Sequence, residues 1–367
     1  MIPESKKTDP ARILIIRTSS IGDVVLATAA LEYIREWSQR TGRAVEMHWA
    51  AREPALGLLR EACPDLKCHE IEDLIKNHTD TLPGPLMACV DLQGNLRSRK
   101  LARRVARHHQ VVVTRASKRY LARGLLVAAS RIFGRSGPSL ALQRALLRLQ
   151  PPVPQYNLAV NAMARALGEN DEAIRLARPR LAVGQADPRI DPSIKWLAVA
   201  PGASHPSKKA PARVFERVLG AFSGKIKPES PTGIVILGDQ RERPDCEELE
   251  RRLKANQWEG PVLNLAGSTT IAGTVSVLAS CQAVLCNDSS LGHISESLGK
   301  PSVVLFGPTI EAFGFAPQLP ASKAFSAALG CRPCSKHGKS ECRYGDLACF
   351  EGIDTRAAGD TLGGIFE

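Results

Sequence analysis

The sequence predicts an α/β protein with two doubly wound halves, each built around a parallel sheet. Short apolar runs alternate with longer amphipathic stretches along the chain, which is typical of repeated strand–helix–strand units. A polar segment with prolines at 179, 188 and 192 divides this series in two, and proline restricts its own backbone and that of the preceding residue, as is common in linkers. The 367 residues are enough for two domains.

The first half begins with a predicted buried strand at residues 12–17, followed by a polar loop and a helix at 23–39 with apolar residues at helical spacing. The other elements expected here are strands at 45–50, 87–91 and 111–114, a helix at 55–62, a basic helix between the last two strands, and two or three helices between about 118 and 167.

The second half repeats this alternation. The elements expected here are strands at 195–200, 233–237, 261–265, 283–286 and 302–306, and helices at 212–222, 243–255, 271–280 and 291–298. The pattern divides the chain into a first domain at residues 1–178, a second at 179–330, and a cysteine-rich tail with a C-terminal helix at 331–367.

The composition is that of an ordinary globular protein, with 44% hydrophobic and 23% charged residues. No stretch approaches the roughly 20 uninterrupted apolar residues of a membrane-spanning helix. The first apolar run, residues 13–16, is too short for the core of a secretory signal. We therefore exclude an integral membrane protein and a secreted disulfide scaffold, and we expect a cytoplasmic protein.

The basic residues are concentrated in one part of the chain. No acidic residue occurs between Asp91 and Glu169, whereas this segment holds fifteen Lys or Arg; subtracting them from the net charge of +12 leaves −3 for the rest. Such a segment attracts a polyanion, and the candidates are a nucleic acid, an anionic membrane surface and a phosphorylated lipid. The alternative is a solvated helix face.

Four of the ten cysteines are close together in the sequence, at Cys331, Cys334, Cys342 and Cys349. Four thiolates at this spacing could hold a structural zinc ion, although the second pair is wider than in a standard zinc ribbon. There are two alternatives to a metal site. The cysteines could be inert thiols, since cysteines of cytoplasmic proteins are ordinarily reduced, or a pair of them could form a disulfide on oxidation.

Polar loops follow several predicted strands, and open α/β sheets bind ligands at these positions. The loop at 18–23 has small hydroxyl residues and a glycine before Asp23, which fits a helix cap and a catalytic base equally well. It is neither a Gly-x-Gly-x-x-Gly fingerprint nor a Walker loop, which disfavours a dinucleotide oxidoreductase and a P-loop ATPase.

Two loops of the second half contain features of phosphate sites. Residues 201–211 combine glycine, serines and two lysines before a helix, which fits a diphosphate site or an exposed turn. Residues 286–293 lead from an apolar strand through Asp288, Ser289 and Ser290 into a helix. These residues fit a helix cap, and the free N–H groups of the helix could also bind phosphate.

These loops, in this order, resemble glycosyltransferase family nine, the ADP-heptose:lipopolysaccharide heptosyltransferases. The matching segments are Thr18–Asp23, Asp91–Ser98, Pro201–Pro211, Leu237–Glu242 and Asn287–His293. The resemblance runs from about residue 12 to residue 350, and it implies two Rossmann-like domains facing a cleft, the GT-B type of fold. The chain departs from the family at Ala210, where Trp is usual, and at Ser290, where Gly is frequent.

The resemblance also implies roles for individual residues. Asp23 would be the general base, and Lys208 would stabilise the departing diphosphate. The donor site would consist of Ser204, Lys208, Glu242, Asp288, Ser289, Ser290 and His293, with Glu242 on the nucleoside. The acceptor side would consist of Ser20, Gln93, Arg97, Arg99 and Lys100, with Arg103 and Arg119 as further candidates.

The implied activity is an inverting, metal-independent transfer of heptose from ADP-heptose to the inner core of lipopolysaccharide, on a 3-deoxy-octulosonate or heptose acceptor. No cofactor would be required, and the enzyme would work in the cytoplasm at the anionic inner leaflet, which gives the basic segment a role. One alternative is a transferase of the same fold with another nucleotide-sugar donor. The other is a basic nucleic-acid-binding protein, which the low aromatic content of 5% disfavours; we expect no nucleic-acid partner.

Overall fold

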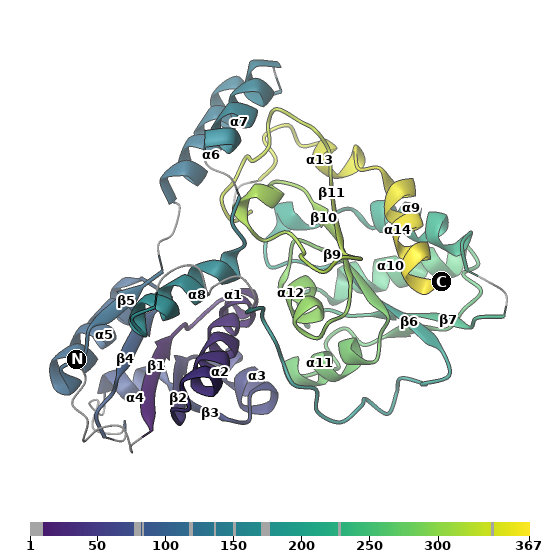
Figure 1. Cartoon of the computed structure of the whole chain (residues 1–367). Helices are drawn as coiled ribbons and strands as arrows, with labels where there is room; N and C mark the ends of the chain where they lie inside the picture. The colour runs from purple at the N-terminus through teal and green to yellow at the C-terminus, as the bar shows by residue number, and fades with distance from the viewer. Residues whose placement is uncertain are drawn as a thin grey trace. The chain divides into compact units, whose positions relative to one another are not determined.

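The computed structural model describes residues 10–76, 82, 84–116, 120–135, 137–149, 152–169, 177–226, 229–338 and 341–367. The chain divides into two compact units (Figure 1): unit 1 comprises Met1–Lys118 and Gln155–Gly184, and unit 2 comprises Arg119–Pro154 and Gln185–Glu367. This division differs from the expected boundaries, because residues 119–154 and the tail both group with the second unit. The described part contains no helix long and apolar enough to cross a membrane.

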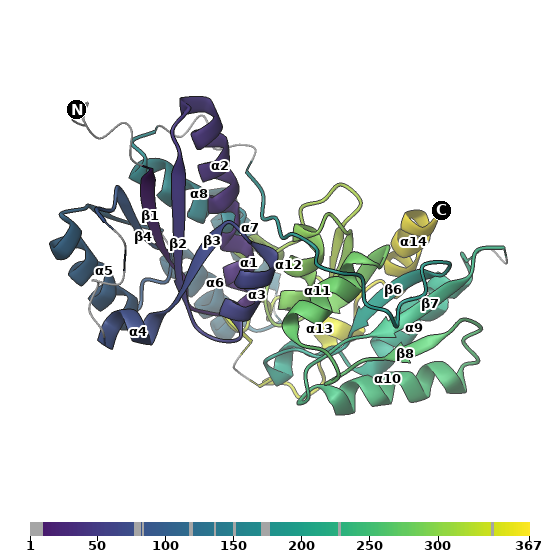
Figure 2. The same ribbon diagram turned by 90° about the horizontal axis from the view of Figure 1, so that it is seen from below.

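Unit 1 is built on a parallel sheet with the strand order β3-β2-β1-β4-β5 (Figures 1 and 2). The strands are β1 (Ala11–Ile16), β2 (Val45–Ala51), β3 (Leu66–Glu70), β4 (Ala88–Asp91) and β5 (Val113–Arg115). The helices are α1 (Ile21–Ala27), α2 (Ala29–Thr41), α3 (Ala55–Ala62), α4 (Ile71–Lys76), α5 (Leu96–His109) and α8 (Gln155–Ala166). Central strand β1 is apolar throughout its buried part because both faces of a parallel sheet are covered.

Unit 1 differs from the predicted elements in two places. The helix expected at 23–39 is two helices that meet at Thr28, whose hydroxyl donates to the carbonyl oxygen of Val25 at 2.7 Å. Strand β3 and helix α4 were not predicted. The strand is polar and half-exposed at the sheet edge, so it lacks the apolar run by which the buried strands were identified.

Unit 2 is built on a second parallel sheet, with the order β11-β10-β9-β6-β7-β8. The strands are β6 (Lys195–Ala200), β7 (Thr232–Ile236), β8 (Val262–Asn264), β9 (Ala283–Asn287), β10 (Ser302–Phe306) and β11 (Lys323–Ser326). The helices are α6 (Tyr120–Phe133), α7 (Gly137–Leu149), α9 (Ala212–Ser223), α10 (Arg243–Ala255), α11 (Ile271–Ala279), α12 (Ser290–Ser297), α13 (Ala348–Glu351) and α14 (Thr355–Phe366). The edge strand β11 was not predicted; the other strands lie within a residue or two of their expected bounds.

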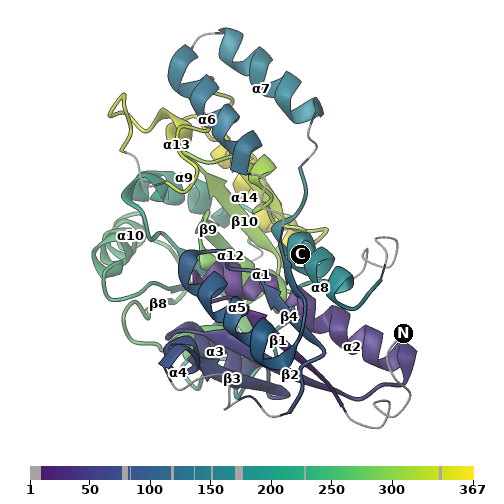
Figure 3. The ribbon, with the colours of Figure 1, turned by 90° about the vertical axis from the view of Figure 1, so that its left-hand side faces the viewer.

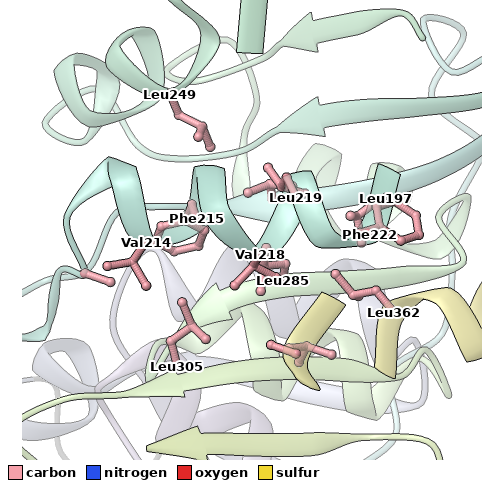
Figure 4. Packing of buried hydrophobic residues seen from close by; sticks show 14 of the residues in the cluster. Leu197, Val214, Phe215, Val218, Leu219, Phe222, Leu249, Leu285, Leu305 and Leu362 are labelled. Carbon is pink, nitrogen blue, oxygen red and sulfur yellow. The ribbon is translucent and has the colours of Figure 1, made fainter. Parts of the chain in front are cut away.

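The core of unit 2 forms where α9 lies on the sheet (Figure 4). Phe215 and Phe222, two turns apart on α9, are fully buried, and burial of each such side chain contributes about 1.5–3 kcal/mol. Helix α14 packs directly on α9. The approach is close because a Cβ atom at Gly359 would come within 2.6 Å of the Cβ atom of Ala221. The C-terminal helix therefore belongs to the core rather than to an independent tail.

Candidate active site

Each sheet reverses its direction of winding between two central strands, and ligands of such sheets bind beyond the carboxyl ends of the strands at this point. In unit 1 the reversal lies between β1 and β4, where Ile16 is paired with Asp91. In unit 2 it lies between β6 and β9, where Ala200 is paired with Cys286. The polar loops identified from the sequence follow these four strands, so the fold brings them together in pairs.

Asp23 lies in the first turn of α1, directly beyond β1. Its Oδ2 atom is 2.7 Å from Nη2 of Arg17 and accepts a hydrogen bond from the Ser20 hydroxyl at 3.1 Å. Burial raises the pKa of Asp23, but the charge of Arg17 and the hydrogen bonds from Ser20 outweigh it and hold the pKa below its ordinary value. The carboxylate is therefore ionised at neutral pH, and its side chain is 30% exposed.

The loop after β4 supports the loop that carries Asp23. Nη1 of Arg17 donates to the carbonyl oxygen of Leu92 at 2.6 Å. The Oε1 atom of Gln93 accepts hydrogen bonds from the backbone N–H groups of Thr18 and Ser19 at 3.0 and 3.3 Å. Gln93 thus orients the loop that leads into α1, the helix that begins after Ser20.

Asp91 is a buried carboxylate that organises the start of α5. Its Oδ1 atom accepts hydrogen bonds from the N–H groups of Gln93 and Gly94 at 3.1 and 2.8 Å, and its Oδ2 atom accepts one from the Ser98 hydroxyl at 3.1 Å. Asn95 caps the helix by accepting from the N–H of Ser98 at 2.9 Å. The Asp-x-x-Gly-Asn sequence therefore fixes the turn from which the basic helix begins.

Helix α5 presents two groups of basic side chains. Arg97 lies against α4, where its Nη1 atom is 3.0 Å from Oε1 of Glu72. Arg99 and Lys100 are exposed and lie on the side of the helix away from the buried Leu101 and Val105. Arg97 is therefore held by an acidic neighbour, whereas Arg99 and Lys100 point to solvent.

Two of the further basic candidates have different positions. Arg103 is exposed on the same side of α5 as Arg99, and helical spacing puts Arg107 on that side too. These exposed residues of α5 form one basic stripe, defined as Arg99, Lys100, Arg103 and Arg107. Arg119 lies outside the described residues.

Asn287 joins two loops of unit 2 at the end of β9. It is fully buried, and its Nδ2 atom donates to the carbonyl oxygens of Pro201 and Gly202 at 2.7 and 3.2 Å. Its Oδ1 atom accepts from the N–H of Ala210 at 3.1 Å. Both the amide nitrogen and the amide oxygen of Asn287 thus hydrogen-bond to the backbone of residues 201–210 and hold this loop at the carboxyl end of the sheet.

Lys208 is the cation at the centre of this end of unit 2. Its Nζ atom is 2.6 Å from Oδ2 of Asp288, and the two side chains are 16% and 6% exposed. The same oxygen of Asp288 accepts a hydrogen bond from the Thr309 hydroxyl at 2.6 Å. Asp288 is therefore placed to position Lys208 rather than to face a ligand. The neighbouring Lys209 is turned away toward Asp245.

Glu242 lies against the same loop, at the start of α10. Its Oε2 atom accepts from the N–H of Asp239 at 3.0 Å, and burial raises the pKa of its carboxyl group. The side chain fits because its neighbour is glycine: a Cβ atom at Gly202 would come within 2.5 Å of Glu242 Cδ. The close approach therefore requires glycine at position 202.

The start of α12 completes the set predicted for the donor. Ser289 caps the helix and Ser290 is its first residue. His293, one turn later, lies with its ring 5.9 Å from that of Phe315. Ser204 is exposed in the loop after β6. The loops after β6, β7 and β9 thus bring the predicted donor residues to one end of unit 2, because these three strands are neighbours in the sheet.

Sequence reasoning missed three roles in these networks: the pairing of Arg17 with Asp23, the hydrogen bonds of Asn287 to the loop at residues 201–210, and the hydrogen bond of Thr309 to Asp288. The pairing of Arg17 could have been predicted, because a charged residue directly after a buried apolar strand either forms an ion pair or is exposed to solvent. Thr309 is 21 residues from Asp288, and no spacing rule relates the two.

The four clustered cysteines line one cavity, together with side chains that include Arg135, Arg332 and Tyr344. All ten cysteines of the chain are free thiols. Within the ranges that the structure describes, no group of three or more His, Cys, Asp or Glu side chains is arranged to hold a metal ion. The arrangement therefore does not support the zinc site expected from the spacing, and neither cysteine pair is bridged.

The thiols of this cavity differ in acidity. Burial raises the pKa of Cys349 to about 12 and also raises that of Cys334. Burial also raises the pKa of Cys342, but backbone N–H groups of residues 344–347 outweigh it and hold the pKa below its ordinary value.

The sequence profile of glycosyltransferase family 9 (heptosyltransferase) matches residues 88–345. The chain belongs to this family. The match includes the turn at Asp91, the Lys208 loop and the start of α12, and it extends over parts of both units. The chain is accordingly a glycosyltransferase. Its two parallel sheets, each followed by polar loops, agree with this class of enzyme.

The chain is also similar to individual members of family 9. It is 37% identical over 76 residues to lipooligosaccharide heptosyltransferase 2 of Haemophilus influenzae, a match that covers 21% of this chain and 22% of the relative. It is 30% identical over 119 residues to the protein of the same name from Haemophilus ducreyi, covering 32% and 33%. The chain spans less than half the length of the curated relatives it matches.

Two solved structures show the fold. A family 9 glycosyltransferase from Veillonella parvula has a TM-score of 0.68 at 15% identity, with 97% of each chain covered. The ADP-heptose lipopolysaccharide heptosyltransferase II of Escherichia coli has a TM-score of 0.62 at 17% identity, covering 97% of this chain and 98% of that one. The fold is therefore the GT-B type that the sequence predicted.

Proposed function

We propose that this family 9 chain transfers heptose from ADP-heptose to the inner core of lipopolysaccharide, with inversion and without a metal ion. The observation that carries the proposal is the ion pair between Lys208 and Asp288, whose Nζ and Oδ2 atoms are 2.6 Å apart. The pair lies beyond the carboxyl ends of β6 and β9, where the sheet of unit 2 reverses its direction of winding. It puts a fixed positive charge beside the start of a helix, which is the arrangement that binds a diphosphate.

The donor would bind at the carboxyl end of the unit 2 sheet. The N–H groups at the start of α12 and the Lys208 ammonium would bind the diphosphate and stabilise the charge that develops on it as the sugar leaves. Lys208 can supply this charge itself, which is the basis for proposing a metal-independent reaction. Glu242 would bind the nucleoside, because its carboxylate lies over Gly202 in the adjacent loop.

Asp23 would act as the general base that removes the proton from the acceptor hydroxyl as the hydroxyl attacks the anomeric carbon. Such a group typically contributes about 10²–10⁴-fold in rate. The pKa below the ordinary value keeps Asp23 deprotonated, and its contacts with Arg17 and Ser20 all involve Oδ2. Direct displacement by the acceptor inverts the anomeric configuration.

The acceptor would be an anionic lipid-linked saccharide, met at the cytoplasmic face of a membrane. The exposed basic stripe of α5, with Arg99 and Lys100, supports this placement, since clustered cations are attracted to anionic groups. Arg97 contributes less net charge because Glu72 lies 3.0 Å from it. Charge reversal at Arg99 and Lys100 should raise the acceptor KM while ADP affinity stays the same.

The first test is calorimetric titration of the full chain with ADP, UDP and GDP. We expect a preference for ADP, and we expect Lys208→Met to weaken ADP binding about tenfold to a hundredfold, as for the loss of a charged hydrogen bond. Lys209→Met is the matched control, because that side chain pairs with Asp245. Preference for UDP or GDP would contradict ADP-heptose as the donor and favour a UDP- or GDP-sugar instead. Salt-sensitive binding to nucleic acid, with no binding of any nucleotide, would overturn the enzyme proposal.

The reaction itself is tested with ADP-heptose and a soluble, de-O-acylated acceptor. We expect Asp23→Asn to abolish transfer while ADP affinity is unchanged, and nuclear magnetic resonance of the product to show inversion. Activity should persist in a chelator. Retention of configuration, or loss of ADP binding in Asp23→Asn, would contradict the assigned mechanism.

A further inference from the structure

Helices α6 and α7 form a hairpin on the outside of unit 2, beside the segment that carries α13 (Figures 1 and 3). The inner side of α6 is buried: Leu126 and Val127 pack against Ile310 and Phe313, with Leu146 and Leu147 of α7 beside them. Nε2 of Gln143 donates to the carbonyl oxygen of Gly330 at 2.9 Å. The hairpin is thus fixed to the unit that carries the proposed donor site.

The outer side of the hairpin carries exposed apolar side chains. Leu125 and Ile132 are 58% and 75% exposed, and their separation of seven residues puts them on one side of α6. Phe133 at the end of α6 and Leu142 on α7 are 42% and 38% exposed. Soluble proteins ordinarily expose large apolar side chains singly, so a cluster of them marks a contact surface.

Tyr344 extends this cluster. Its hydroxyl lies beside Gly134 at the end of α6, where a Cβ atom would come within 2.5 Å of it. The guanidinium groups of Arg135 and Arg343 lie 4.1 and 5.1 Å from the centre of its ring. Five of the eight large apolar side chains found exposed in the described ranges therefore lie on the two helices of the hairpin or beside the end of α6. We call this group the hairpin patch, defined as Leu125, Ile132, Phe133, Leu142 and Tyr344.

The charge around the hairpin patch is positive. Arg131, Arg144 and Arg148 are exposed on the same two helices. The segment between Asp91 and Glu169 contains no acidic residue, so the hairpin supplies no negative charge of its own. Arg135, in the turn after α6, is paired with Asp346 at 2.6 Å, and Nε of Arg131 donates to the carbonyl oxygen of Cys334 at 3.2 Å.

We propose that the hairpin patch inserts into the headgroup region of an anionic bilayer, with the surrounding arginines on the lipid phosphates. Exposed leucine, isoleucine and aromatic side chains flanked by arginine are the chemistry of an interfacial membrane helix. The two helices contain arginines and no acidic residue, which makes their charge complementary to that of an anionic bilayer. This inference deepens the proposed function, since it would hold the donor-binding unit at the surface where a lipid-linked acceptor resides.

The test is flotation of the full chain with vesicles of phosphatidylcholine alone and of phosphatidylcholine with phosphatidylglycerol. We expect binding to the anionic vesicles and a decrease of about tenfold or more in Leu125→Ser/Ile132→Ser. The matched control is Val112→Ser/Val183→Ser, which removes two side chains of similar exposure, 79% and 51%, from unit 1. Equal loss in both variants, or no loss in the first, would overturn the proposal.

The charge and the depth of insertion are tested separately. Replacing Arg144 and Arg148 by Gln should weaken anionic binding about fivefold per charge, with no change for neutral vesicles. A tryptophan in place of Leu125 should be quenched by brominated lipids, which requires contact with the acyl region. Absence of quenching, or a preference for oligonucleotides over anionic vesicles, would contradict a lipid surface.

The outcome can be separated from the fate of the proposed function. Transfer of heptose to the soluble, de-O-acylated acceptor requires no bilayer, so Leu125→Ser/Ile132→Ser should retain wild-type activity in that assay. Lipid binding by a chain that transfers no heptose would support the hairpin proposal and overturn the proposed function. Transfer of heptose by a chain that binds no lipid would support the proposed function and overturn the hairpin proposal.

Discussion

The Arg17–Asp23 pair gives the sharpest test of the proposed catalytic base. The two side chains are 11% and 30% exposed, and the closest atoms are 2.7 Å apart. With roughly 4 Å between charge centres, unit charges interact by about 1 kcal/mol in water and about 4 kcal/mol at the dielectric constant effective near a protein surface. Because 1.36 kcal/mol is a tenfold change, Arg17→Met should raise the proton affinity of Asp23 between about 5-fold and about 1000-fold.

The consequence is a change in the pH dependence of transfer. A general base works only when deprotonated, so kcat/KM falls as the pH drops through its pKa. The pKa of Asp23 lies below its ordinary value in the folded protein, and Arg17→Met should move the acidic limb of the profile to higher pH. Arg17→Lys keeps the charge and is the control, and Asp23→Asn should remove the limb.

A second measurement does not depend on activity. Since folding lowers the pKa of Asp23, the stability it contributes is present above the pKa of the unfolded chain and is lost as the pH falls through the folded value. The free energy of unfolding should therefore decrease less on acidification in Arg17→Met than in the wild type. An unchanged acidic limb, or an equal displacement in Arg17→Lys, would refute the electrostatic coupling between Arg17 and the base.

Three further predictions concern unit 2. Gly202→Ala should weaken ADP binding and destabilise the fold by about 1–3 kcal/mol through overpacking against Glu242, whereas Gly220→Ala, with no atom within 4 Å of the new Cβ, should be neutral or stabilising in thermal unfolding. Arg332→Met should lower the melting temperature, because the buried guanidinium donates to three backbone carbonyls and each unpaired group costs about 1–3 kcal/mol; an unchanged melting temperature would contradict this. Cys342 should be alkylated first by iodoacetamide, as mass spectrometry of brief reactions can show, and earlier labelling of Cys349 would contradict the pKa order.

Most of the architecture could be predicted from the sequence because the central strands are buried on both faces. Strands β1, β6 and β9 are continuous apolar runs between polar loops, and their ends were located to within about a residue. The edge strands β3 and β11 could not be recognised, since they are half-exposed and mix polar with apolar residues. The break at Thr28 was also missed, because the apolar spacing continues across it.

The candidate site was predicted as a set of loops but not as a network. Asp23, Lys208 and Asp288 were singled out from their positions in loops after strands, whereas Gln93 was implied by the family resemblance alone. Asp23 finds its partners nearby, at Arg17 and Ser20, but the partner of Lys208 is distant in sequence, since Asp288 is 80 residues away. The thiol cluster shows the opposite case, in which close spacing suggested a metal site that the described side chains do not form.

The sequence by itself determined the alternation of strands and helices, the concentration of positive charge and the loops that identify the family, because each depends on residues that are neighbours along the chain. Only the tertiary structure decided which unit residues 119–154 join, which lysine faces Asp288, and which apolar side chains remain exposed. These depend on packing between segments far apart in sequence, such as Val127 against Phe313, and burial is a property of the assembled fold rather than of any local pattern.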